Sequence, residues 1–244
     1  MTESVVTFGT ANRLVGIRST CGTPTRSTAV VLANSGVVHR VGANRMSVRI
    51  ARTLAGEGFD TLRFDMSGLG DSSDRGDGLG WERSAPLELI EAVDLMTVEQ
   101  QRTTILYGNC GGAAKSVWAA LRDQRIRGLL LTNTPPHPAE SEAGASAKAA
   151  AQAAVQVARD LAQLFDRGVR AIFIYAEGDE GQQYFQRRLA EPLARYIDAG
   201  ALTTAVVPHS NHTFAPGPAA QRVTLLALEW LNRYFPEGTG HDDC

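Results

Sequence analysis

Short apolar runs alternate with helical patterns from about residue 29 to the end of this 244-residue chain. The runs are rich in Val, Ile, Leu and Phe, as expected for strands that are covered on both faces. Between them, apolar residues recur at intervals of three and four, the spacing of one helix face. This alternation is typical of βαβ units, which place a mostly parallel sheet between two layers of helices. The expected strands are residues 29–33, 61–64, 103–108, 127–133, 171–176 and 203–207.

The remaining segments complete an α/β fold that we expect to be a single domain over residues 1–244. Residues 4–8 and 13–18 flank a Gly-Thr-Ala-Asn turn and predict an antiparallel hairpin ahead of the parallel strands. An alanine-rich tract follows the break Pro-Pro-His-Pro, and we expect residues 138–166 to form a small helical cap inserted over the sheet. An ordinary crossover helix with a long entry is the alternative for this tract. Helices are also expected around residues 46–54, 87–96, 113–121, 184–197 and 219–234.

Composition excludes several classes of function. The net charge is -2, and the arginines are scattered, so no nucleic-acid partner is expected. The first residues lack the pattern of a signal peptide, and no apolar run approaches the roughly 20 residues that span a bilayer. These features predict a cytoplasmic protein with no membrane partner. The three cysteines, Cys21, Cys110 and Cys244, lack CxxC spacing, so neither a disulfide framework, a metal site nor a cofactor is expected.

A tight turn at Cys110 joins the strand 103–108 to the next helix. Its sequence is Tyr-Gly-Asn-Cys-Gly-Gly-Ala, with glycine two residues before and two residues after the cysteine. This is the small-x-nucleophile-x-small pattern of a nucleophile elbow, in which a strained residue lifts its side chain clear of the sheet. The Cys110 thiol would lie at a helix N-terminus, where the dipole and free N–H groups favour the thiolate. The amide of Gly111 is the expected donor to an oxyanion.

Candidates for an acid and a base follow at the ends of two later strands. The strand 171–176 ends in Glu-Gly-Asp-Glu-Gly, and the strand 203–207 ends in Pro-His-Ser-Asn-His-Thr-Phe. A nucleophile followed by an acid and then a histidine is the chain order of one class of catalytic triad. We favour Asp179, in its glycine-flanked turn, as the acid, with Glu177 and Glu180 as the alternatives.

His212 is the favoured base, because it stands immediately before Thr-Phe and the approach to the last helix. His209 has the simpler interpretation of a histidine on a surface loop. Cys110 could instead be an inert buried thiol, since cysteine is among the most buried residue types. A dinucleotide-binding loop is excluded, because it needs glycine where Cys110 stands and an acidic residue some 20 positions later. A zinc site that combines Cys110 with the two histidines is disfavoured, because the elbow explains the cysteine better.

From Val30 to its end, the chain resembles the α/β-hydrolases, and it is similar to small bacterial serine-aminopeptidase-like and exosortase-associated hydrolases and to thioesterases. The resemblance rests on the stretch from Asn34 to Ser73 together with Gly-Asn-Cys-Gly-Gly, Glu-Gly-Asp-Glu-Gly and Asn-His-Thr-Phe. These motifs are specific for the fold and not for the substrate. Cys110 replaces the usual serine, as in dienelactone hydrolases and some biosynthetic thioesterases. This departure argues against ordinary peptidase or lipase activity.

The resemblance also implies roles for the loop after the first parallel strand. Relatives place their second oxyanion donor there, which makes the amide of Val37 the candidate, with Gly36 behind it. His39 and Arg40 follow and could meet a substrate carboxylate or a phosphopantetheine phosphate, although they could equally anchor the loop. Four residues match the family's next turn and are interpreted as structural: Asp65, Gly68, Gly70 and Asp71.

Taken together, the motifs predict a cysteine-dependent acyl hydrolase or acyltransferase that uses a Cys-His-Asp triad and a covalent acyl-enzyme. The expected partner is a small ester or thioester, including acyl groups on coenzyme A or a carrier protein, in a biosynthetic pathway. One alternative is a dienelactone-hydrolase-like enzyme that opens a small anionic lactone. Another is a non-catalytic binding protein that retains the fold, in which Cys110 has no chemical role.

Overall fold

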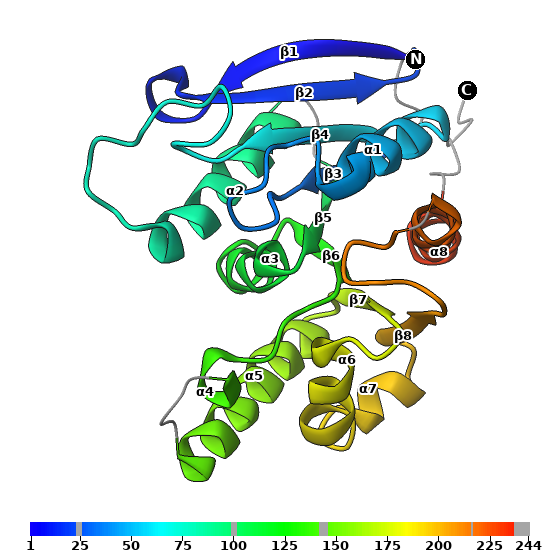
Figure 1. The fold of residues 1–244 in the computed structure, drawn as a ribbon. Helices are drawn as coiled ribbons and strands as arrows, with labels where there is room; N and C mark the ends of the chain where they lie inside the picture. Colours follow the sequence, from blue (N-terminus) through cyan, green and yellow to red (C-terminus); the bar gives the residue numbers. More distant parts are fainter. Residues whose placement is uncertain (23–25, 99–101, 142–145, 216, 237–244) are drawn as a thin grey trace.

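The computed structural model describes residues 1–22, 26–98, 102–141, 146–215 and 217–236. Within these residues one sheet of eight strands runs in the order β1-β2-β4-β3-β5-β6-β7-β8 (Figure 1). The hairpin β1–β2 pairs antiparallel with β4, and the neighbouring strands from β4 to β8 are parallel to one another. The predicted mostly parallel α/β fold is therefore confirmed. The strands are Thr2–Phe8 (β1), Leu14–Thr20 (β2), Thr28–Leu32 (β3), Asp60–Asp65 (β4), Thr103–Asn109 (β5), Ile126–Thr132 (β6), Arg170–Ala176 (β7) and Leu202–Val207 (β8).

Helices cover both faces of the sheet (Figure 1). One face carries α1 (Met46–Gly56) and α8 (Gly217–Tyr234), and the other carries α2 (Trp81–Thr97), α3 (Gly111–Arg122) and α5 (Ala147–Asp166). Strand β3 shows why the apolar runs are continuous: every one of its residues is buried, with alternate side chains entering two separate cores. Burial on both faces is the main stabilising contribution to these strands.

The tract 138–166, expected as a helical cap, forms α4 (Pro138–Ser141) and α5. Helix α5 also makes the crossover between the neighbouring parallel strands β6 and β7. Its C-terminal half buries Leu161, Leu164 and Phe165 in the core. Ser146 caps its N-terminus by accepting a hydrogen bond from the amide of Ala149 at 3.1 Å. The tract therefore contains the crossover helix that was the alternative interpretation, and three residues of α5 also line a cavity described below.

The single helix expected around residues 184–197 is the one element that was wrong. The chain instead forms α6 (Glu180–Tyr184), a π-helical turn (Phe185–Leu189) and α7 (Ala194–Asp198). Pro192 explains the break, because proline lacks an N–H and clashes with the carbonyl of the preceding turn. The amide of Ala190 donates to the carbonyl of Phe185 at 2.9 Å, which is the wider spacing of a π-turn.

The carboxyl ends of the parallel strands place six loops along one edge of the sheet. These loops follow β3, β4, β5, β6, β7 and β8, and hydrogen bonds continue some of the strand pairing into them. The amide of Cys110 donates to the carbonyl of Thr132 at 3.0 Å, and that of Glu177 donates to Val207 at 3.1 Å. Ligands of open α/β sheets bind at this edge. None of the helices within the described residues is long and apolar enough to cross a bilayer, and Cys244 lies outside those residues.

Candidate active site

Cys110 occupies a sharp turn between β5 and α3. Its backbone has φ 50° and ψ -121°, a region that residues with a side chain rarely adopt. The flanking glycines leave the room that this turn needs. A methyl group on Gly112 would lie 2.3 Å from the carbonyl oxygen of Asn34, and one on Gly108 would lie 2.6 Å from the carbonyl oxygen of Gly112. Glycine is therefore required at positions 108 and 112 because the backbone at each position packs directly against another stretch of backbone.

The structure brings Cys110, His212 and Asp179 together from three loops. Nδ1 of His212 lies 2.6 Å from Oδ2 of Asp179, and the His212 side chain also hydrogen-bonds to Cys110. The other carboxylate oxygen of Asp179 accepts a hydrogen bond from the amide of Gly181 at 2.9 Å. Asp179 is thereby fixed at the N-terminus of α6, with its side chain 8% exposed. This is the arrangement of an acid that orients a histidine toward a nucleophile.

The charges of these three groups favour a thiolate paired with an imidazolium. The hydrogen bond to Asp179, followed by the bond to Cys110, raises the pKa of His212 to about 10 despite partial burial. The hydrogen bond from His212 holds the pKa of Cys110 below that of an ordinary thiol, and the amide of Gly111 acts in the same direction. Burial and the charge of Asp179 oppose this shift of the Cys110 pKa. A thiolate is the nucleophilic form of cysteine.

Asn133 holds the histidine loop in place, and the sequence analysis did not single it out. The side chain is fully buried at the end of β6. Its Nδ2 donates to the carbonyl of His212 at 2.7 Å, while its Oδ1 accepts from the amide of Ala176 at 2.8 Å. Phe214, buried to 2% exposure with φ 53°, plugs the same loop into the core. The available signal for Asn133 is a polar residue directly after a buried strand and two residues before Pro-Pro.

The alternative acids, Glu177 and Glu180, and the alternative base, His209, have exposed side chains, and Glu177 contacts His209. Glu177 has a side chain that is 58% exposed and accepts a hydrogen bond from the amide of His209 at 3.0 Å. The His209 side chain is 95% exposed. Glu180 is also exposed, in the first turn of α6. Asp179 and His212 are therefore the pair that the local geometry favours.

Gly111 and the loop after β3 lie next to each other beside Cys110. The amide of Gly111 hydrogen-bonds the sulfur, at the start of α3. A methyl group on Gly111 would lie 3.5 Å from the nitrogen of Gly36, and among the described residues only Gly36 contributes atoms within 4 Å of that point. The Val37 side chain points outward and is 80% exposed. The amide of Val37 stays the predicted second oxyanion donor, and Gly36 behind it also lies close to Gly111.

A cavity of about 470 Å³ opens beside the elbow and includes Gly111 in its wall. Its size is within the range of small-molecule sites. Helix α3 forms one wall, and the segment 134–138, α5 and α6 contribute others. The lining is mainly apolar and aromatic, with Trp81, Trp118, Phe173, Tyr175 and Tyr184. A substrate attacked at Cys110 would have this cavity next to its carbonyl group.

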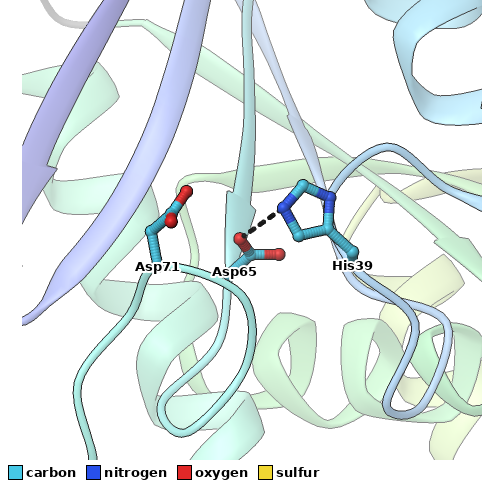
Figure 2. A group of neighbouring side chains, drawn as sticks. All are labelled: His39, Asp65 and Asp71. Carbon is cyan, nitrogen blue, oxygen red and sulfur yellow. Dashed lines mark ion pairs between the residues drawn. The ribbon is translucent and has the colours of Figure 1, made fainter.

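His39 and Arg40 lie on the loop after β3, outside the residues that line the cavity. The Arg40 guanidinium pairs with the carboxylates of Asp65 and Asp71, and its backbone amide donates to Asp65 at 2.6 Å. Figure 2 shows His39 pointing toward Asp65, with 3.3 Å between Nε2 and the carboxylate. These contacts support the loop-anchoring interpretation of both residues.

The cluster of His39, Asp65 and Asp71 has the donor types of a metal site (Figure 2). The guanidinium of Arg40 already binds both carboxylates. A metal cation would have to displace the Arg40 guanidinium from both carboxylates. The cluster is therefore explained as an anchor that joins the loops after β3 and β4.

Comparison with known proteins gives the fold. No protein-family model and no curated protein sequence matches the chain. An α/β serine hydrolase without lid from Xanthomonas campestris matches with a TM-score of 0.65 at 14% identity, covering 97% of this chain and 96% of that chain. Dienelactone hydrolase from Anabaena variabilis matches with a TM-score of 0.68 at 17% identity, covering 96% and 98%. The esterase domain of a Rhodothermus marinus protein has a TM-score of 0.64 at 16% identity, covering 96% and 100%. The chain therefore has the α/β-hydrolase fold.

Proposed function

We propose that this protein is a cysteine-dependent acyl hydrolase or acyltransferase that acts on a thioester or an ester. The observation that carries the proposal is the strained Cys110 turn, whose thiol pKa is lowered by a histidine that Asp179 orients. A lone structural cysteine requires neither the backbone strain nor the paired histidine. The similarity of fold to hydrolases and esterases supports the same class of reaction.

Acylation begins with the Cys110 thiolate. The sulfur attacks the carbonyl carbon, a carbon–sulfur bond forms, and the carbonyl π electrons move to the oxygen. In this proposal the amide of Gly111 and an amide of the loop after β3, that of Val37 or of Gly36 behind it, donate to that oxyanion. As the intermediate collapses, the bond to the leaving thiol or alcohol breaks, and the His212 imidazolium gives its proton to the leaving group. The products are an acyl-thioester on Cys110 and a neutral His212.

Deacylation returns the site to its starting state. Neutral His212 takes a proton from water or from an acceptor, which attacks the acyl carbon. Collapse of the second intermediate expels the Cys110 thiolate, and the imidazolium is restored beside it. Because the intermediate is itself a thioester, thiols and amines can compete with water for the acyl group. This chemistry is the reason to keep acyl transfer beside hydrolysis.

A lactone hydrolase is the second candidate. The similarity of fold to dienelactone hydrolase favours it, and the cavity contains a cationic side chain, Lys115, that could meet an anionic lactone. Ring opening by Cys110 would use the same acylation step, with the alkoxide remaining attached to the acyl group. Turnover of small anionic lactones, combined with no turnover of thioesters, would favour this candidate.

Mass spectrometry after rapid acid quenching tests the covalent step. The protein is mixed with a panel of acyl N-acetylcysteamine thioesters and activated esters, and the modified peptide is mapped. We expect a single acyl adduct on Cys110 that is retained in Cys21→Ala and lost in Cys110→Ala. If no substrate leaves an adduct on Cys110, covalent catalysis is excluded and a binding protein on this fold becomes the better account.

A further inference from the structure

A buried lysine lies in the wall of the cavity beside the elbow. Lys115 has a side chain that is 6% exposed, whereas lysines are almost never buried unless they are paired. It is the only lysine or arginine among the described residues that line this cavity. Its nitrogen also lies 5.0 Å from the ring centre of Trp118, within reach of a cation–π contact. The triad mechanism makes no use of this charge.

The position of Lys115 on α3 relates it directly to the reacting centre. Residues four apart on a helix lie on the same face, so Lys115 follows Gly111 along the wall of the cavity. Four residues correspond to a rise of ~6 Å along the helix. That rise is the length of about five bonds of an extended carbon chain. An acyl group whose carbonyl is at Gly111 would bring its fifth or sixth carbon into the neighbourhood of Lys115.

Glu82 neutralises Lys115 in a way that allows exchange. The two side chains form an ion pair, but that of Glu82 is 71% exposed and reaches the lysine from the first turn of α2. Leaving the pair would return Glu82 to water at little cost of desolvation. Asp160, another carboxylate of the lining, is hydrogen-bonded to Gln156 at 2.7 Å. A substrate carboxylate could therefore replace Glu82 without leaving Lys115 unpaired.

Tyr184 supplies a second polar group to the wall of the cavity. The residue is only 3% exposed, and its phenol oxygen is buried with no hydrogen-bond partner. Buried polar atoms of this kind are costly unless something bonds to them. An entirely apolar acyl chain would leave Lys115 paired with Glu82 and would offer no acceptor to the Tyr184 phenol. A chain that carries a polar group brings an acceptor into a lining that holds both a cation and an unpartnered phenol.

We propose that the cavity binds an acyl group with an apolar stem and a terminal carboxylate. Lys115 selects this substrate because the carboxylate takes the place of Glu82 in the ion pair. The inference rests on the proposed acyl chemistry of Cys110, and it names the substrate class as the monothioesters or monoesters of dicarboxylic acids of about six carbons. The aromatic wall packs the stem, and the lysine determines which chain end is accepted. Lys115 is a specificity-determining residue in this account.

Paired substrates test the proposal. Adipyl and hexanoyl N-acetylcysteamine thioesters have the same six-carbon chain and differ in the terminal carboxylate. We expect the wild type to prefer adipyl, and Lys115→Met to lower the adipyl-to-hexanoyl ratio of kcat/KM by about 10- to 100-fold, the size of a lost charge-assisted hydrogen bond. Glu82→Gln should raise the ratio, because it weakens the competing partner of Lys115. Lys148→Met, a change to the exposed lysine of α5, is the matched control and should leave the ratio unchanged.

Binding to Cys110→Ala separates failure of this inference from failure of the proposed function. Tryptophan fluorescence reports binding, since Trp81 and Trp118 line the cavity. Tighter binding of adipyl than of hexanoyl thioester, abolished by adding Lys115→Met, supports the inference even if no acyl adduct forms on Cys110. Acylation of Cys110 with no preference for adipyl overturns the inference and leaves the proposed function in place. If folded Lys115→Met loses kcat/KM equally for the adipyl and hexanoyl thioesters, the lysine has a structural role and the inference is overturned.

Discussion

Replacing Cys110 with glycine should stabilise the protein relative to replacing it with alanine. Both variants lose the sulfur and its contact with His212, so they differ only in the methyl group and in backbone freedom. At φ 50° and ψ -121°, Cys110 has the backbone of the first central residue of a type II′ turn, which glycine adopts without strain. Alanine retains the strain of the native residue. The comparison therefore measures what the turn costs.

Two opposing contributions set the magnitude. A residue held in a sparsely populated region costs on the order of 1–3 kcal/mol, which glycine recovers. Glycine loses roughly 0.5–1 kcal/mol because it gives the unfolded chain more freedom. The net gain of Cys110→Gly over Cys110→Ala is then about 0–2.5 kcal/mol. For a domain of this size, each 1 kcal/mol corresponds to about 2–4 °C in Tm.

Urea unfolding at neutral pH measures this difference through the midpoint at constant m-value. Exposed Cys21, which is not among the residues with positive φ, offers the matched control. Cys21→Gly should be less stable than Cys21→Ala, and this difference reports the effect of chain freedom alone. If Cys110→Gly loses as much stability as Cys21→Gly does, relative to each alanine variant, the turn is not strained and the reasoning from the elbow is refuted.

Two further changes probe the same site. Asp179→Asn removes the main cause of the raised His212 pKa, so the alkaline limb of the acylation rate should move down by about one to three pH units, and an unmoved limb would contradict the assigned acid. Gly112→Ala places a methyl group 2.3 Å from the backbone oxygen of Asn34 and should cost more than about 2 kcal/mol in urea unfolding, whereas Gly56→Ala, with open space around it at the end of α1, should be neutral or stabilising. Equal effects of these two glycine changes would show that the elbow tolerates side chains.

The parts of the fold that follow from local periodicity were predictable from the sequence. Strand β3 is apolar from Ala29 to Leu32 because both of its faces are buried. The order of the strands along the chain gives the order of the three triad residues. Pro192 lies inside the range 184–197 and could have predicted the helix break, but the apolar spacing of that range favours one continuous helix. In the site, Asp179 and His212 could be selected because they lie at the ends of parallel strands. The glycines on either side of Cys110 predict the tight turn that the structure shows at this residue.

Features that depend on tertiary packing could not be predicted from the sequence. The Arg40 guanidinium could serve a substrate or a carboxylate of the chain, and only the folded structure brings Asp65 and Asp71 to it. Lys115 has no distinguishing local pattern among the residues of α3, because its burial results from contact with the start of α2. Gly36 lies nearer to Gly111 than Val37 does because of the path of the loop after β3.

The pH dependence of alkylation at Cys110 tests the central claim, that this thiol is a nucleophile activated by His212. Iodoacetamide labelling followed by peptide mapping gives the midpoint for Cys110, and labelling of exposed Cys21 in the same sample shows that the reagent is active. The midpoint reports the thiolate population and is independent of how reactive each thiolate is. An ordinary thiol with a pKa of about 8.5 is only ~0.3% ionised at pH 6.

We predict that wild-type Cys110 titrates below an ordinary thiol and is labelled rapidly at pH 6. In His212→Ala, the remaining influences of burial and Asp179 raise the Cys110 pKa, while only the amide of Gly111 lowers it, so the midpoint should rise to that of an ordinary thiol or above. A wild-type Cys110 midpoint that matches an ordinary thiol and does not move in His212→Ala would mean that the thiol is inert, and the account of a coupled nucleophile would be wrong.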